Sequence, residues 1–119
     1  MARHLTIEVS LTDNDRGTTW ANSFDVTTSD DTVACGEQPI GASEEAIDLG
    51  QLTTLGWGYF ENLDETRTIE LRKATGAPED IIQLSPGESM VIHFGSDVSA
   101  PFAIASSATA ILRYVIFSI

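Results

Sequence analysis

The sequence has little of what a catalytic, metal-binding or disulfide-stabilised protein needs. Among its 119 residues there is one cysteine, Cys35, so the chain cannot form a disulfide within itself. Its two histidines, His4 and His93, do not have the spacing of metal ligands. We expect Cys35 to be a small buried or half-buried residue, and both histidines to be surface or hydrogen-bonded side chains.

Motifs of known catalytic chemistry are also missing. There is no Gly-x-Ser-x-Gly, no His-Glu-x-x-His and no Walker loop. Gly56-Trp57-Gly58 begins a dinucleotide-type glycine pattern, but Glu61 stands where its third glycine would fall. We interpret the two glycines as making room for Trp57 and Tyr59 or bending a strand. The sequence thus predicts a non-enzyme, with no catalytic residue, no cofactor-binding residue, no cofactor and no metal site.

Basic residues are scarce. Six lysines and arginines face 18 acidic residues, which gives a formal net charge of −12. A chain of this charge repels a phosphate backbone and an anionic membrane surface, so we expect no nucleic-acid partner and no membrane partner. The acidity favours solubility. A basic partner or loosely bound cations remain the alternative explanation.

Long apolar runs are missing too. No run approaches the roughly 20 residues that span a membrane. The first ten residues, MARHLTIEVS, lack the charged head, apolar middle and small-residue cleavage site of a secretory signal. We therefore expect a chain that is made and kept in a cytoplasm, unless it leaves as part of an assembly.

Alternation of apolar and polar residues is the strongest pattern present. It predicts a strand over residues 4–12 and a second over 18–27. Their apolar positions are Leu5, Ile7, Val9, Leu11, Trp20, Phe24 and Val26, with Asn22 as a polar exception on the same face. Residues 13–17 resemble half of a calcium loop, but the closing glutamate is missing, so we prefer a hairpin turn.

Further short strands are predicted at 32–35, 56–63, 68–73, 81–84, 89–94 and 109–119, and a short strand is preferred to a helical turn within 44–51. Loops are expected at 36–43, 74–80 and 95–108. Eight or nine strands with turns between them predict an all-β fold. Within that class we expect a single antiparallel, jelly-roll-like β-sandwich domain over residues 1–119.

The last predicted strand, 109–119, is apolar on both faces. Ile111, Val115 and Phe117 share one face, whereas Leu112, Tyr114 and Ile116 share the other. A strand that is apolar on both faces is covered on both faces. In a sandwich with one core, the second cover would come from another chain.

Three aromatic residues, Trp20, Trp57 and Tyr59, have two interpretations. Large aromatic side chains dominate the cores of small sandwiches, so core packing is the first. The second is a platform on which the apolar face of a sugar ring stacks. The sequence leaves both open.

Several short motifs carry a family resemblance. They are IDLGQLTTLG at 47–56, YFENLD at 59–64, LSPGE at 84–88, APFA at 100–103 and LRY at 112–114. Together they resemble a pattern found in small β-sandwich proteins that are encoded among the structural genes of tailed bacteriophages, of the capsid-decoration or head-fibre type. The first 40 residues share no motif with that pattern beyond being β.

The resemblance implies a non-enzymatic structural component of a phage particle, which decorates or stabilises the capsid through self-association and shell contacts. Its partners would be other copies of itself, with a trimer as one option, and virion proteins such as the major capsid protein. It would be made in the host cytoplasm and end in the virion. The alternatives are a structural protein of the tail or neck, and a carbohydrate-binding β-sandwich module.

Overall fold

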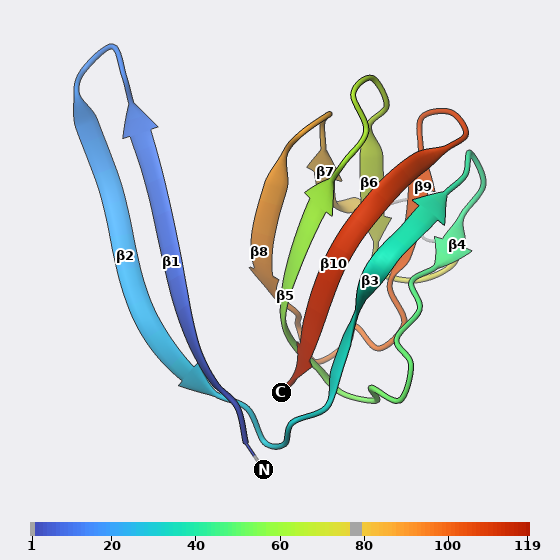
Figure 1. Ribbon diagram of the computed structural model, residues 1–119, viewed down its shortest axis with the longest axis horizontal. Coiled ribbons are helices and arrows are strands. Elements are labelled where there is room, and N and C mark those ends of the chain that lie inside the picture. The colour runs from blue at the N-terminus through green and yellow to red at the C-terminus, as the bar shows by residue number, and fades with distance from the viewer. Residues whose placement is uncertain (1, 77–79) are drawn as a thin grey trace. The chain divides into compact units, whose positions relative to one another are not determined.

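The computed structural model is built from β-strands (Figure 1). It describes residues 2–76 and 80–119, and within these ranges the chain forms ten strands in antiparallel sheets and no helix. The predicted all-β class is confirmed. The centre of the predicted loop 74–80, with Pro78, lies outside the described residues. The chain divides into two compact units, Met1–Asp31 and Thr32–Ile119, so one domain over 1–119 stays a prediction.

The first unit is a hairpin of β1 (His4–Asp13) and β2 (Thr18–Thr27), paired without a bulge from His4↔Thr27 to Asp13↔Thr18. At its turn, the Asp13 carboxylate accepts hydrogen bonds from the backbone N–H groups of Asp15 and Arg16, at 3.1 and 3.3 Å. Gly17 then takes a φ of 69°, which glycine adopts at little cost. The predicted hairpin turn is confirmed.

The second unit contains two four-stranded sheets. The first sheet has the order β3-β10-β5-β8 and the second has the order β4-β9-β6-β7. The strands of the first are β3 (Val33–Ile40), β10 (Ala110–Ser118), β5 (Leu55–Asn62) and β8 (Ser89–His93). Those of the second are β4 (Glu45–Ala46), β9 (Phe102–Ala105), β6 (Ile69–Arg72) and β7 (Asp80–Leu84).

One core lies between these two sheets. Burial alternates along β5 and β10, as expected for strands with one face inward. Phe60, Leu112 and Ile116 of the first sheet and Ile69 and Leu71 of the second are at most 1% exposed. Their contacts form one cluster of buried residues drawn from both sheets.

Two predicted loops are wrong in part. Residues 36–43 were expected to be loop, yet β3 continues to Ile40 through Gly36 and Pro39. β3 is an edge strand, where proline's missing N–H leaves no gap in a central ladder. The predicted loop 95–108 contains β9, whose Ala103 and Ala105 fill the core with small side chains. The expected short strand at 44–51 is the two-residue β4.

The glycines of β5 have a role different from the expected one. A Cβ at Gly56 would lie 2.7 Å from the backbone oxygen of Ser118. A Cβ at Gly58 would lie 2.9 Å from a ring carbon of Phe60 and 3.0 Å from one of Phe94. The interpretation that they make room for Trp57 and Tyr59 is therefore wrong, because their space is taken by the end of β10 and by core rings.

A buried asparagine fixes the turn after β5. Asn62 is 0% exposed, and its Nδ2 donates to the carbonyls of Arg67 and Leu84 at 2.7 and 3.1 Å. Its Oδ1 accepts a hydrogen bond from the backbone N–H of Asp64 at 2.9 Å. The side chain thus ties the end of the first sheet to β7 of the second. A buried amide is tolerated in a core only when it is satisfied in this way.

The neighbouring carboxylate closes the same turn. Asp64 accepts hydrogen bonds from the backbone N–H groups of Thr66 and Arg67, at 2.9 and 2.6 Å. These bonds favour the ionised form and lower the pKa of Asp64 below its ordinary value of 3.8.

We expect the Asn62→Ala variant to lose about 2–4 kcal/mol of unfolding free energy, because the buried carbonyl of Leu84 and the partly buried carbonyl of Arg67 lose their donor and a small cavity forms. Urea unfolding followed by circular dichroism measures this change. The matched control is Thr54→Ala at an exposed site just before β5, with an expected change under about 0.5 kcal/mol. An Asn62→Ala variant as stable as the parent would mean that the turn does not depend on these bonds.

The Asp64→Asn variant should be less stable than the parent near pH 7. Because the pKa of Asp64 is lowered on folding, its contribution is present above the unfolded pKa of 3.8 and is lost as the pH falls through the lower folded value. The gap between the two urea midpoints should therefore begin to narrow near pH 3.8 and close once the pH is below the lower folded pKa. Glu65→Gln, exposed in the same turn, removes one charge without these bonds. A gap that is constant with pH would contradict the assignment.

Candidate interaction surface

One face of the hairpin is apolar and carries no charge. We call it the ribbon face, and it consists of Leu5, Ile7, Val9, Leu11, Trp20, Asn22, Phe24 and Val26. The register places these residues opposite one another as predicted, including the polar exception Asn22. Towards the turn the face is open, with Val9 46%, Leu11 68% and Trp20 57% exposed.

The opposite face of the hairpin is polar, and its side chains form hydrogen bonds with one another. The Thr6 hydroxyl donates to the Asp25 carboxylate at 2.9 Å, and the hydroxyls of Thr12 and Thr19 lie 3.0 Å apart. These are cross-strand pairs on the face that also carries Glu8. This face suits water, so the two faces of the hairpin differ sharply in character.

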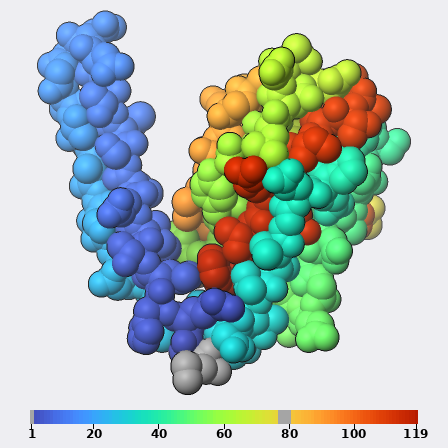
Figure 2. Space-filling model, viewed as in Figure 1, coloured from blue at the N-terminus to red at the C-terminus, as the bar shows by residue number. Residues whose placement is uncertain are grey.

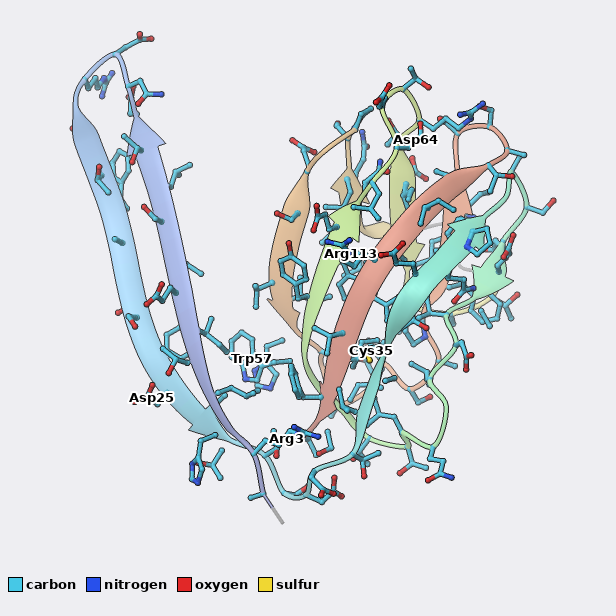
Figure 3. All side chains as sticks on the ribbon, viewed as in Figure 1. Arg3, Asp25, Cys35, Trp57, Asp64 and Arg113 are labelled. Atoms are coloured by element: carbon cyan, nitrogen blue, oxygen red, sulfur yellow. The ribbon has the colours of Figure 1, made fainter. Side chains whose placement is uncertain are left out.

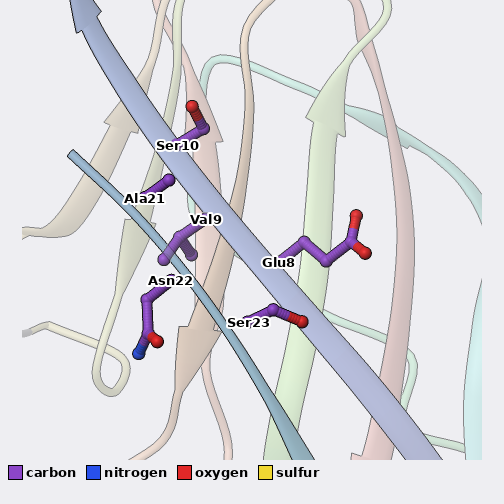
Figure 4. Close-up of a pocket in the computed structure, with 6 residues that line it drawn as sticks. All are labelled: Glu8, Val9, Ser10, Ala21, Asn22 and Ser23. Atoms are coloured by element: carbon purple, nitrogen blue, oxygen red, sulfur yellow. The ribbon is translucent and has the colours of Figure 1, made fainter. Parts of the chain in front are cut away.

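A hollow of about 540 Å³ lies along the hairpin and is shown in Figure 4. Its lining residues are Glu8, Val9, Ser10, Ala21, Asn22 and Ser23. They form three successive cross-strand pairs, and successive pairs point to opposite faces. A hollow lined from both sides of a ribbon does not enclose a ligand. The hairpin therefore offers a surface and not a binding cavity.

The first sheet of the second unit also has an outward face with apolar side chains. We call it the outer sheet face, and it consists of Val33, Cys35, Trp57, Tyr59, Val91, Val115 and Phe117. Figure 2 shows this side of the unit, with β10 in red between β3 in cyan and β5 in green. Its members alternate with core residues along each strand, and all except the exposed Cys35 are half-buried.

The final strand therefore has the two different faces that its sequence indicates. Leu112 and Ile116 are fully buried in the core, whereas Val115 and Phe117 are half-buried on the outer sheet face. The expectation that another chain covers this second face stays a prediction.

A charged cluster borders the outer sheet face. Arg113 lies between Glu37 of β3 and Glu61 of β5, with N–O distances of 3.1 and 3.8 Å. Figure 3 labels Arg113 on β10. The Glu37 carboxylate, by a hydrogen bond and by its charge, raises the pKa of Arg113 above its usual value. The Tyr59 hydroxyl donates to Glu61 at 2.9 Å. One arginine thus offsets half of the charge of two carboxylates at this edge of the face.

The candidate aromatic residues do not lie in the core. Trp57 and Tyr59 are two residues apart on β5 and point outward, and the Trp57 ring stacks on His93 with centroids 4.4 Å apart. Trp20 belongs to the hairpin and is 57% exposed. The core-packing interpretation is therefore wrong. The aromatic core residues are Phe60, Phe94 and Tyr114, which pack as ring pairs at 5.9 and 6.4 Å.

The remaining candidate side chains, His4, Cys35 and His93, lie on three different strands. His4 and His93 are exposed, as expected, and His4 Nδ1 lies 3.3 Å from the Thr27 hydroxyl. Cys35 is exposed, so the expected buried or half-buried thiol is wrong. Within residues 2–76 and 80–119, no three His, Cys, Asp or Glu side chains are grouped to hold a metal ion. The same residues include no helix long and apolar enough to cross a bilayer.

Comparison with known proteins gives no match: no family model fits the chain, and no curated protein and no solved structure is significantly similar to it.

Proposed function

We propose that the chain is a non-enzymatic structural component of a bacteriophage particle, which decorates or stabilises the capsid through self-association and contacts with the shell. The ribbon face is the observation that carries this proposal. Two strands cannot enclose a core, and an isolated hairpin is at best marginally stable in water. An uncharged apolar face on such a hairpin therefore favours a protein that works by packing against another surface.

We also propose that the second unit is a jelly-roll β-sandwich. Its strand order supports this. When its eight strands are counted from β3 to β10, the first sheet reads 1-8-3-6 and the second reads 2-7-4-5. This is the order in which two Greek keys wrap around one core, and jelly rolls serve as viral capsid and lectin domains. The support for a particle protein is by analogy of fold, and it adds to the motif resemblance.

In this proposal the partners are other copies of the chain and the major capsid protein, and the place of work is the virion. A structural protein of the tail or neck would use the same two faces. The net charge of −12 keeps free copies apart in solution before they assemble.

The proposal is tested by sedimentation of the purified chain with empty capsids, made from the major capsid gene of the same genome, and separately with tails. We expect saturable binding to capsids. Trp20→Glu should weaken it at least about tenfold, as expected when a charge replaces a large exposed aromatic side chain in an apolar contact. Ser10→Glu, on the polar face of β1, is the matched control and should bind like the parent.

Binding to tails alone would support the alternative, a structural protein of the tail or neck. Binding to neither particle part would refute the structural role.

A carbohydrate-binding module is the second candidate, and one observation favours it. Trp57 and Tyr59 share one outward face beside the Glu61 carboxylate, which combines stacking surface with a hydrogen-bond acceptor. On this function, a glycan array should show binding that Trp57→Ala and Tyr59→Ala abolish. Trp20→Ala, in the other unit, should leave it unchanged. A parent protein that binds no glycan, or variants that bind equally well, would reject the module.

A further inference from the structure

We propose that the ribbon face of one copy packs on the outer sheet face of a second copy, so that copies exchange their hairpins. This inference rests on the proposed function, because it names the surfaces through which the chain would self-associate. The occupant of each face is then a second copy of this same chain.

The ribbon face requires a cover of a particular kind. It is uncharged, it follows a ten-residue hairpin, and its most exposed members are Leu11 and Trp20 towards the turn, whereas Ile7 is already buried. Its reverse side is polar and already hydrogen-bonded across the strands. Only one side therefore gains from burial. An apolar face of paired strands packs well on another sheet face, at a spacing of about 10 Å.

The sheet that carries the outer sheet face is nearly as long as the hairpin, and the outer sheet face is apolar like the ribbon face. A ten-residue hairpin is about 34 Å long, and the nine-residue β10 at the centre of the face is about 30 Å long. Val115 and Phe117 supply an apolar centre, and Val33 and Tyr59 flank them on the neighbouring strands. The hairpin can therefore lie along β10 with its apolar side chains on this centre, and the row of Glu37, Arg113 and Glu61 marks one end of the apolar contact.

Charge favours a second copy over a different protein. The unit Met1–Asp31 has six acidic and two basic residues, and the unit Thr32–Ile119 has 12 and four. Two copies repel each other unless they meet where carboxylates are missing or neutralised. The ribbon face has none, and at the border of the outer sheet face Glu37 and Glu61 are paired with Arg113. A basic partner would be drawn to the acidic surfaces instead.

The area of contact favours exchange over the pairing of two hairpins. A two-stranded ribbon about 34 Å long and about 10 Å wide has a footprint of roughly 300 Å². One ribbon-to-ribbon contact is thus well below the roughly 800 Å² per partner of a stable interface. In a reciprocal exchange each copy contributes both a ribbon face and a sheet face. The footprint doubles, and interdigitated side chains bury more area than a flat footprint does.

The test is complementation between two variants, measured by sedimentation velocity over a range of concentrations. Leu11→Glu places a charge on the ribbon face, and Val115→Glu places one on the outer sheet face. Each variant alone should associate at least about tenfold more weakly than the parent. An equimolar mixture should recover part of the association, because the intact hairpin of the Val115→Glu copy can pack on the intact sheet face of the Leu11→Glu copy. This heterodimer keeps one of its two contacts undisturbed, whereas in each variant alone both contacts carry a charge.

Matched controls place the same charge on surfaces outside the two faces. Ser10→Glu lies on the polar face of β1, and Gln83→Glu lies on the exposed side of β7 in the other sheet. Both should associate like the parent. Circular dichroism confirms that each variant is folded. If Val115→Glu unfolds, Val115→Thr replaces it, because threonine has nearly the shape of valine and exchanges one methyl group for a hydroxyl that a dry contact would leave without water.

Three results would overturn the exchange. One is a folded parent that stays monomeric at every concentration, which would mean that the ribbon face is covered within its own chain. Another is normal association of Val115→Glu with loss only in Leu11→Glu, which would mean that hairpins pair with hairpins. The third is two folded, weakened variants whose mixture recovers nothing. Capsid sedimentation is scored separately: copies that exchange hairpins but bind no particle overturn the proposed function alone.

Discussion

The structure depends on the two-residue period of its strands, because each strand must place its side chains on two different faces. Along β10, Leu112 and Ile116 enter the core while Val115 and Phe117 point outward. The core between the two sheets covers one face of each sheet. Any further apolar side chain on these strands lies outside it. The hairpin has the same property in a simpler form, since its two strands have one apolar face and no core between sheets.

Local pattern was enough to predict the features that depend on adjacent residues. The alternation in residues 4–12 and 18–27 predicted the two faces of the hairpin and the position of Asn22 on the apolar one, and the register confirms both. The turn at Pro86 and Gly87 could be predicted because proline fixes its own φ near the value that the second turn position needs, and glycine permits the positive φ of the third. Gly87 has a φ of 79°, and the N–H of Glu88 donates to the carbonyl of Ser85 at 3.0 Å.

Features that depend on distant neighbours could not be predicted. Pro39 indicated a loop, but an edge position in the sheet permits it within a strand. Gly58 leaves space for the rings of Phe60 and Phe94. Phe94 directly follows β8, which is distant in the sequence but pairs with β5. The outer sheet face has the same difficulty, because Val33, Val91 and Phe117 come together only once the strand order is known. The exposure of Cys35 follows from that order as well.

Edges and faces of the two units offer different routes to association. The edge strand β3 contains Gly36 and Pro39, and a proline on an edge hinders the addition of another strand because it lacks an N–H donor. The described part of β10 is paired on both sides, so its backbone is already satisfied. At the centre of this sheet a partner can therefore contact side chains but cannot pair with the backbone. In a chain with a net charge of −12, the uncharged faces are where such contact costs least, which favours packing between faces over the joining of edges.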